Sequence, residues 1–187
     1  MAVRINKAAE RYAISLYQLA QEQGVTDTIK EELAGIHNAI HEVNKLENLL
    51  HSPVVQPLKK GAILQQIFAG QVSSLTSKFL DLLARRSRID LLADICTSFI
   101  QHYNEQHGLV ELTIRTATDI SDDLLKQLVD KVESTLGKKA LVETTVDPNL
   151  LGGWILELPD RYLDASLSTQ LQQIRKSFQE PAFHNTL

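Results

Sequence analysis

The sequence predicts an α+β protein with an N-terminal antiparallel helical bundle of five to six helices, followed by a small β-α-β-β-α domain. Apolar residues recur every three to four positions up to about residue 105, which is the period of helices that bury one face. At Gly108 the period changes to two, as in a half-buried strand. A chain of 187 residues can hold two small cores, so we expect domains over 1–105 and 106–178 and a mobile tail over 179–187.

The composition excludes several classes of protein. With 43% hydrophobic and 22% charged residues, the chain is neither disordered nor fibrous. A net charge of −4 argues against a broad nucleic-acid-binding surface, and the lone Cys96 can form no internal disulfide. No apolar run approaches the roughly 20 residues that span a bilayer, and the first residues lack the apolar core of a signal peptide. We therefore expect no direct membrane insertion.

Two long helices are predicted first. Residues 5–20 place apolar side chains on one face, and Gly24 ends this helix. Thr28 with Glu31 three positions later predicts a capping box at the start of the second helix. The expected buried face of the second helix is Ile29, Leu33, Ile36, Ile40, Val43 and Leu50.

Three further helices complete the predicted bundle. Pro57 suits the first position of the third helix, Ser73 or Ser74 caps the fourth, and the fifth begins near Ile89. Because the connections are short, neighbouring helices should be antiparallel. Their expected inward faces are Leu58, Ala62, Ile63 and Ile67, then Leu75, Phe79, Leu82 and Leu83, then Leu92, Ile95, Phe99 and Tyr103.

The second half of the chain alternates between the two periods. Strands are expected over 110–114, 142–146 and 154–158, the last with its even positions better buried, and Ser121 caps the helix after the first strand. Ser166 or Ser168 caps a final helix. The apolar face of that helix is Leu167, Leu171, Ile174 and Phe178.

The stretch 146–178 resembles the C-terminal signature of the δ subunit of F-type ATP synthases, the homologue of the mitochondrial protein that confers oligomycin sensitivity. That family has a D-P-x-L-x-G-G turn, an aliphatic strand and an aspartate-serine segment before a helix rich in Leu and Arg. Pro159 departs from the pattern, since the family usually has glycine there. The matching residues are Asp147, Pro148, Leu150, Gly152, Gly153, Asp160, Asp164, Ser166, Leu171 and Arg175.

The helical half resembles the same family, so the resemblance covers nearly the whole chain. The matching positions are Tyr12, Ala13, Leu16, Leu19, Ala20, Pro53, Lys60, Phe79, Leu80, Leu83, Arg88, Leu92 and Phe99.

No catalytic, cofactor or metal site is predicted. Gly137-Lys138 lacks the earlier glycine of a phosphate-binding loop, and Gly152-Gly153 precedes a strand rather than a helix. His37 and His41 have the spacing of two metal ligands but no third ligand, so we interpret them as an exposed face. Cys96 is expected to pack in the core.

Charged residues elsewhere have structural explanations. Asp160 and Asp164 are expected to cap the last helix rather than to act as paired catalytic carboxylates. The basic clusters are interpreted as charges that offset helix dipoles rather than as an RNA site. These clusters are Arg85, Arg86 and Arg88, with Lys59 and Lys60.

The resemblance implies a non-enzymatic stator subunit present in one copy per complex. In the family, the helical domain binds the N-terminal helix of an ATP synthase α subunit on the F1 catalytic head, and the C-terminal domain engages the C-terminal end of the b subunit. The subunit thereby couples ATP synthesis to hydrogen ion transport. The resemblance also implies no cofactor and no nucleic-acid partner. The position it implies is peripheral, on the cytoplasmic face of a bacterial inner membrane or the stromal face of a thylakoid.

We hypothesise that the helices over 5–20 and 89–103 line the groove for the α-subunit helix, with Tyr12, Ala13 and Leu16 as partner-binding residues. Stalk contact would use the exposed face of the last helix or the sheet edge, while Trp154 and Leu156 form core. Two alternatives remain: an RNA-binding helical domain of the antitermination type, which requires a contiguous basic face, and a small enzyme, which requires convergent polar groups.

Overall fold

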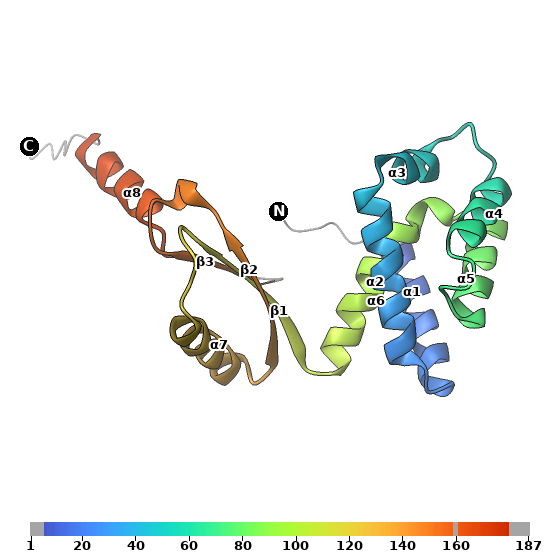
Figure 1. The fold of residues 1–187 in the computed structure, drawn as a ribbon, viewed down its shortest axis with the longest axis horizontal. Coiled ribbons are helices and arrows are strands. Elements are labelled where there is room, and N and C mark those ends of the chain that lie inside the picture. The colour runs from blue at the N-terminus through green and yellow to red at the C-terminus, as the bar shows by residue number, and fades with distance from the viewer. Residues whose placement is uncertain (1–5, 159–160, 180–187) are drawn as a thin grey trace, which may run out of the picture. The chain divides into compact units, whose positions relative to one another are not determined.

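The computed structural model describes residues 6–158 and 161–179 and divides the chain into two compact units (Figure 1). The first ends at Gln106 and the second begins at His107. Pro159, Asp160 and the segment 180–187 lie outside the described residues, so the expectations for them stay untested.

The first unit contains the predicted bundle, now resolved into six α-helices. α6 packs against both α1 and α2, and α4 packs against α5 (Figure 1). A 3-10 turn, Ile89–Leu91, precedes α6. The helices are α1 (Lys7–Glu22), α2 (Thr26–Glu42), α3 (Asn44–His51), α4 (Pro57–Ile67), α5 (Ser74–Arg85) and α6 (Leu92–Gln106).

The long second helix predicted from the sequence is two helices. The chain leaves helical geometry at Val43, with φ −106° and ψ 89°, and Val43 is exposed rather than buried. Leu50 is buried as expected, but from α3. The capping box at Thr28 is also wrong, because α2 begins two residues earlier, at Thr26.

The inward face predicted for α4 is wrong. Leu58 and Ile67 are exposed, and the buried positions are Lys60, Gly61 and Leu64. Gly61 explains the rotation, because a Cβ atom there would lie 2.6 Å from the Cβ of Ala84 on α5. The absence of a side chain lets the two helices approach closely, so the glycine and not the leucine faces the neighbour.

The second unit is a four-stranded sheet with strand order β2-β1-β3-β4. β1 pairs parallel with β2 and antiparallel with β3, which pairs antiparallel with β4. α7 covers one face, where its apolar residues pack on Leu112, Ile114 and Leu156 (Figure 1). The elements are β1 (Leu109–Thr116), α7 (Asp122–Leu136), β2 (Lys139–Val146), β3 (Trp154–Glu157), β4 (Tyr162–Asp164) and α8 (Leu167–Gln179).

Two details of this unit differ from the sequence prediction. β4 has only three residues, too few to show an alternating pattern, and was not predicted. In β3, Ile155 is buried as deeply as Leu156, whereas Trp154 is half-buried. The start of α8 packs beside Gly152, next to β3, so this strand has cover beyond the face that contacts α7.

The signature segment is a compact joint between β3 and α8. Gly153 has φ +79°, and a Cβ atom there would lie 2.2 Å from the carbonyl oxygen of Ala165. The Ser166 hydroxyl accepts a hydrogen bond from the Thr169 backbone N–H, which confirms Ser166 as the N-cap of α8. Asp164 supports this cap by accepting from the Ser166 N–H and the Thr169 hydroxyl, both at 2.8 Å.

Candidate partner-binding groove

α1 carries two apolar faces, and only one of them is covered by the bundle. The covered face includes Ala9, Ala13 and Ala20, which are fully buried and allow α6 to pack closely. The second face runs from Tyr12 through Leu16 to Leu19. A helix with a single core-facing stripe would place polar residues at these positions.

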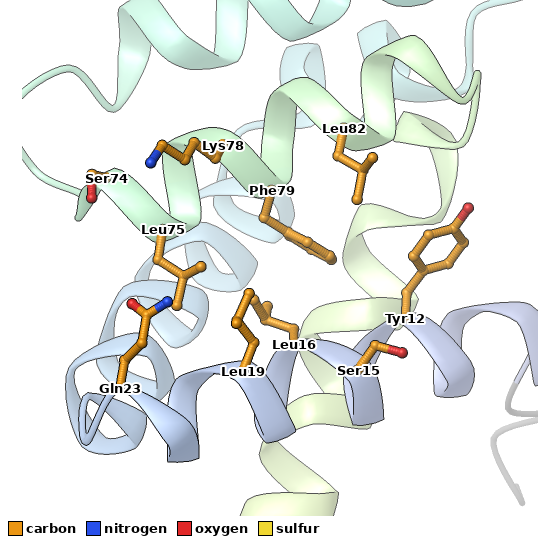
Figure 2. Close-up of a pocket in the computed structure, with 10 residues that line it drawn as sticks. All are labelled: Tyr12, Ser15, Leu16, Leu19, Gln23, Ser74, Leu75, Lys78, Phe79 and Leu82. Carbon is orange, nitrogen blue, oxygen red and sulfur yellow. The ribbon is translucent and has the colours of Figure 1, made fainter.

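The second face of α1 forms one wall of a groove of about 540 Å³, and α5 forms the other (Figure 2). Tyr12 and Leu82 lie at one end in Figure 2, and Gln23 and Leu75 lie at the other. Leu19 and Leu82 are 41% and 43% exposed although both are apolar. The lining residues are Tyr12, Ser15, Leu16 and Leu19 from α1, its C-cap Gln23, and Ser74, Leu75, Lys78, Phe79 and Leu82 from α5.

The groove is nearly uncharged. Lys78 is the single charged residue among those that line it, and no carboxylate does so. The hydroxyl of Ser15 donates to the carbonyl oxygen of Arg11 on its own helix, at 2.9 Å. The walls of the groove can therefore make mainly apolar contacts. Such a groove suits the apolar face of an amphipathic helix better than a polar small molecule.

The structure places the predicted partner-binding residues in two different environments. Tyr12 and Leu16 line the groove, whereas Ala13 is 0% exposed and belongs to the interior. The second wall of this groove is α5, whereas the sequence prediction paired the first helix with the helix over 89–103. α6 packs closely on the alanine-rich face of α1, so this face of α1 has no free surface for a partner.

The sequence held a signal for the α5 wall of this groove. Apolar residues on α5 at positions 75, 79, 80, 82 and 83 form a stripe wider than one helix–helix contact can cover. Leu80 and Leu83 are fully buried, while Leu75 and Leu82 are left for the groove.

The remaining candidate sites do not form a catalytic centre. The His37 and His41 rings lie 4.4 Å apart, and partial burial together with His41 lowers the pKa of His37. Within the described residues, no group of three or more potential metal ligands occurs. Cys96 is fully buried, which raises the pKa of its thiol to about 12, so it is unsuited to act as a nucleophile.

Two of the basic residues have structural partners. Arg85 pairs with Asp81 at 2.8 Å in the last turns of α5. Lys60 is buried and hydrogen-bonds the carbonyl oxygen of Leu50. Arg85 and Lys60 therefore make structural contacts at helix ends.

A second apolar surface lies on α8. Leu167, Leu171 and Ile174 follow one another at helical spacing and are 47%, 56% and 52% exposed.

Within residues 6–158 and 161–179, no helix combines the length and apolar character needed to cross a membrane.

An apolar groove and an exposed apolar helix face are typical of a protein that binds other proteins. Comparison with known proteins identifies its kind. Residues 8–178 match the family model "ATP synthase delta (OSCP) subunit", and the chain belongs to this family.

Curated relatives match over nearly their full length. The chain is 32% identical to ATP synthase subunit delta of Chloroherpeton thalassium, over 92% of this chain and 94% of the relative. It is 35% identical to the Chlorobium phaeobacteroides subunit delta, over 91% and 94%. Its fold is similar to a chain of the Toxoplasma gondii mitochondrial ATP synthase, with a TM-score of 0.70, 21% identity and coverage of 94% and 99%.

Family membership fixes the function at the level of the complex. The chain is a structural component of the peripheral stalk of an F-type ATP synthase, associated with the other subunits of that membrane complex. The matches to ATP synthase subunits give no support to the RNA-binding alternative.

Proposed function

We propose that the groove between α1 and α5 binds the N-terminal helix of the ATP synthase α subunit and so attaches the first unit to the catalytic head. The observation that carries this proposal is the exposed apolar lining. Leu19 and Leu82 each leave about two fifths of their surface open on facing walls. Burying such surface is the main favourable term in helix-in-groove recognition.

The mechanical task requires a tight joint. The head must not turn with the rotor, so the contact has to stay closed under torque. Nanomolar affinity corresponds to about −12 kcal/mol, and a few buried aromatic and aliphatic anchors can dominate such a value. Phe79 and Leu16 at the floor of the groove, with the exposed leucines at its rim, offer these anchors.

The second unit binds the C-terminal end of the b subunit in this proposal. The exposed residues Leu167 and Leu171 support α8 as the contact surface. Leu167 also packs on Gly152, which joins the contact surface to the signature turn. One copy of the chain then links one head to one stalk, at the cytoplasmic face of a bacterial inner membrane or the stromal face of a thylakoid.

Calorimetric titration of the full chain with a peptide from the N-terminus of the same organism's α subunit tests the head contact. We expect saturable one-to-one binding with a negative ΔCp, the mark of apolar burial. A peptide of the same composition in scrambled order is the control, since it cannot present an apolar face. Equal binding of both peptides, or of neither, would overturn the assignment of the groove.

A further inference from the structure

The start of α5 is held by a carboxylate from another helix. Glu32 of α2 accepts hydrogen bonds from the backbone N–H of Ser73 at 2.7 Å, the Ser73 hydroxyl at 3.0 Å and the Thr76 hydroxyl at 2.5 Å. Ser73 is the N-cap of α5 and accepts from the Thr76 N–H at 3.3 Å. Glu32 is half-buried and Thr76 is fully buried, so water competes little for these contacts.

This arrangement is a capping box completed by a second helix. In a capping box within one helix, a Glu or Gln at position N3 reaches back to the N-cap N–H. Here Thr76 occupies N3, and Glu32 takes the N-cap N–H instead. The negative charge also lies at the positive end of the α5 dipole. The cap therefore stabilises α5 and at the same time ties it to α2.

The hydrogen bonds between Glu32 and the start of α5 lie directly beside the groove. Ser74 and Leu75, which line the groove, follow Ser73 in the chain and lie between the two residues that Glu32 binds. α5 otherwise packs on α4 and the Ile89–Leu91 turn rather than closely on α1. The separation of the two groove walls thus depends on where the first turn of α5 is held.

We propose that Glu32 is a positioning residue for partner binding: it touches no partner itself, but it fixes α5 at the distance from α1 at which the groove admits a helix. This inference rests on the proposed function of the groove. Without the carboxylate, α5 should occupy several positions, only some of which accept the partner. The apparent affinity then falls by the fraction of competent molecules.

Distances between α1 and α5 test the positioning role without any partner. Spin labels on Gln18→Cys and Arg85→Cys report the separation, since both sites are exposed and neither lines the groove. Cys96 is fully buried and should stay unlabelled. We expect Glu32→Ala to broaden or displace the distance distribution and Glu32→Gln, which keeps the shape and one acceptor, to do so less.

Titration of the same full-length variants with the α-subunit peptide gives the second readout. We expect Glu32→Ala to weaken binding of the peptide about tenfold, which corresponds to about one tenth of the molecules being competent to bind. The affinity of Glu32→Gln should lie between those of Glu32→Ala and the parent. Glu31→Ala removes the same charge from an exposed neighbour and should change neither readout. Leu46→Ala destabilises the core of the same unit away from the groove and should change stability alone.

An unchanged distance distribution in Glu32→Ala would overturn the proposal, and so would an altered distribution with unchanged peptide affinity. Equal loss of affinity in Leu46→Ala would also overturn it, because general destabilisation would then explain the effect. If the parent chain binds no peptide, the proposed function of the groove fails. The spin-label distances still decide whether Glu32 positions α5.

Discussion

The ammonium group of Lys60 donates a 2.6 Å hydrogen bond to the carbonyl oxygen of Leu50. Lys60 lies in the first turns of α4 and Leu50 in the last turn of α3, where carbonyl oxygens lack partners within their own helix. The buried positive charge also offsets the negative end of the α3 dipole. Lys60, one of the positions that match the family, therefore links α4 to α3 through this hydrogen bond.

Replacing this lysine should destabilise the helical unit. Lys60→Met keeps the apolar stem but leaves the Leu50 carbonyl without its donor, at a cost of about 1–3 kcal/mol. Lys59→Met is the matched control because Lys59 is exposed. Urea unfolding followed by circular dichroism measures the stability of both variants. Equal stability of the two would contradict a stabilising role for the hydrogen bond between Lys60 and Leu50.

The signature turn should tolerate no side chain at Gly153. Gly153→Ala combines a positive φ with a Cβ atom 2.2 Å from the Ala165 carbonyl oxygen, so we expect a loss of about 3 kcal/mol. Gly137→Ala separates the two effects, since Gly137 has φ +65° but open space around it and should lose only about 1–2 kcal/mol. Fluorescence of Trp154, the single tryptophan, reports this unit. Similar losses for both variants would show that the close contact is unimportant.

A charge in the groove should abolish head binding without unfolding the chain. Leu82→Glu places a carboxylate on the apolar wall of α5, and we expect the affinity for the α-subunit peptide to fall at least about tenfold. Val54→Glu is the control, because Val54 is 89% exposed in the same unit and lies away from the groove. Titration calorimetry measures both, and normal binding by Leu82→Glu would exclude this wall from the contact.

A charge on α8 should act on the stalk contact alone. Leu171→Asp is expected to weaken binding of a C-terminal fragment of the b subunit about tenfold while leaving the α-subunit peptide unaffected. Leu124→Asp changes an equally apolar, exposed position on α7 and should bind the fragment normally. If Leu124→Asp were the defective variant, the stalk contact would belong to α7.

The cap of α8 should give the second unit an acid-sensitive contribution to stability. Hydrogen bonds from Ser166, and then from Thr169, lower the pKa of Asp164 below its ordinary value. Because the pKa is lower in the folded chain, the contribution is complete above about pH 4 and is lost as pH falls through the folded pKa. Asp164→Asn should therefore be less stable at neutral pH and approach the parent in acid. Denaturation followed by Trp154 fluorescence measures this, and a difference independent of pH would rule out the carboxylate.

The sequence by itself determined most of the local structure. Helical spacing located the helices of the first unit, except that it joined α2 and α3 into one, and the change of period at Gly108 located the first strand of the second unit. Two cap positions were predicted with one alternative each, Ser73 or Ser74 and Ser166 or Ser168, because capping depends on side chains within three residues of the helix start. The structure selects Ser73 and Ser166. The signature around Gly152 and Gly153 identified the family for the same reason, since its contacts are made over a short stretch.

Only the tertiary structure decided which apolar surface stays open. Periodicity shows that α1 and α5 carry apolar faces, but it does not say which neighbour covers each face. Ala13 became interior because α6 packs on the small residues of α1, and Leu82 became groove lining because nothing in the described bundle covers it. The phase of α4 and the reach of Glu32 to Ser73 likewise depend on residues more than 20 positions apart in sequence. Such contacts follow from how helices pack against one another, which no local pattern records.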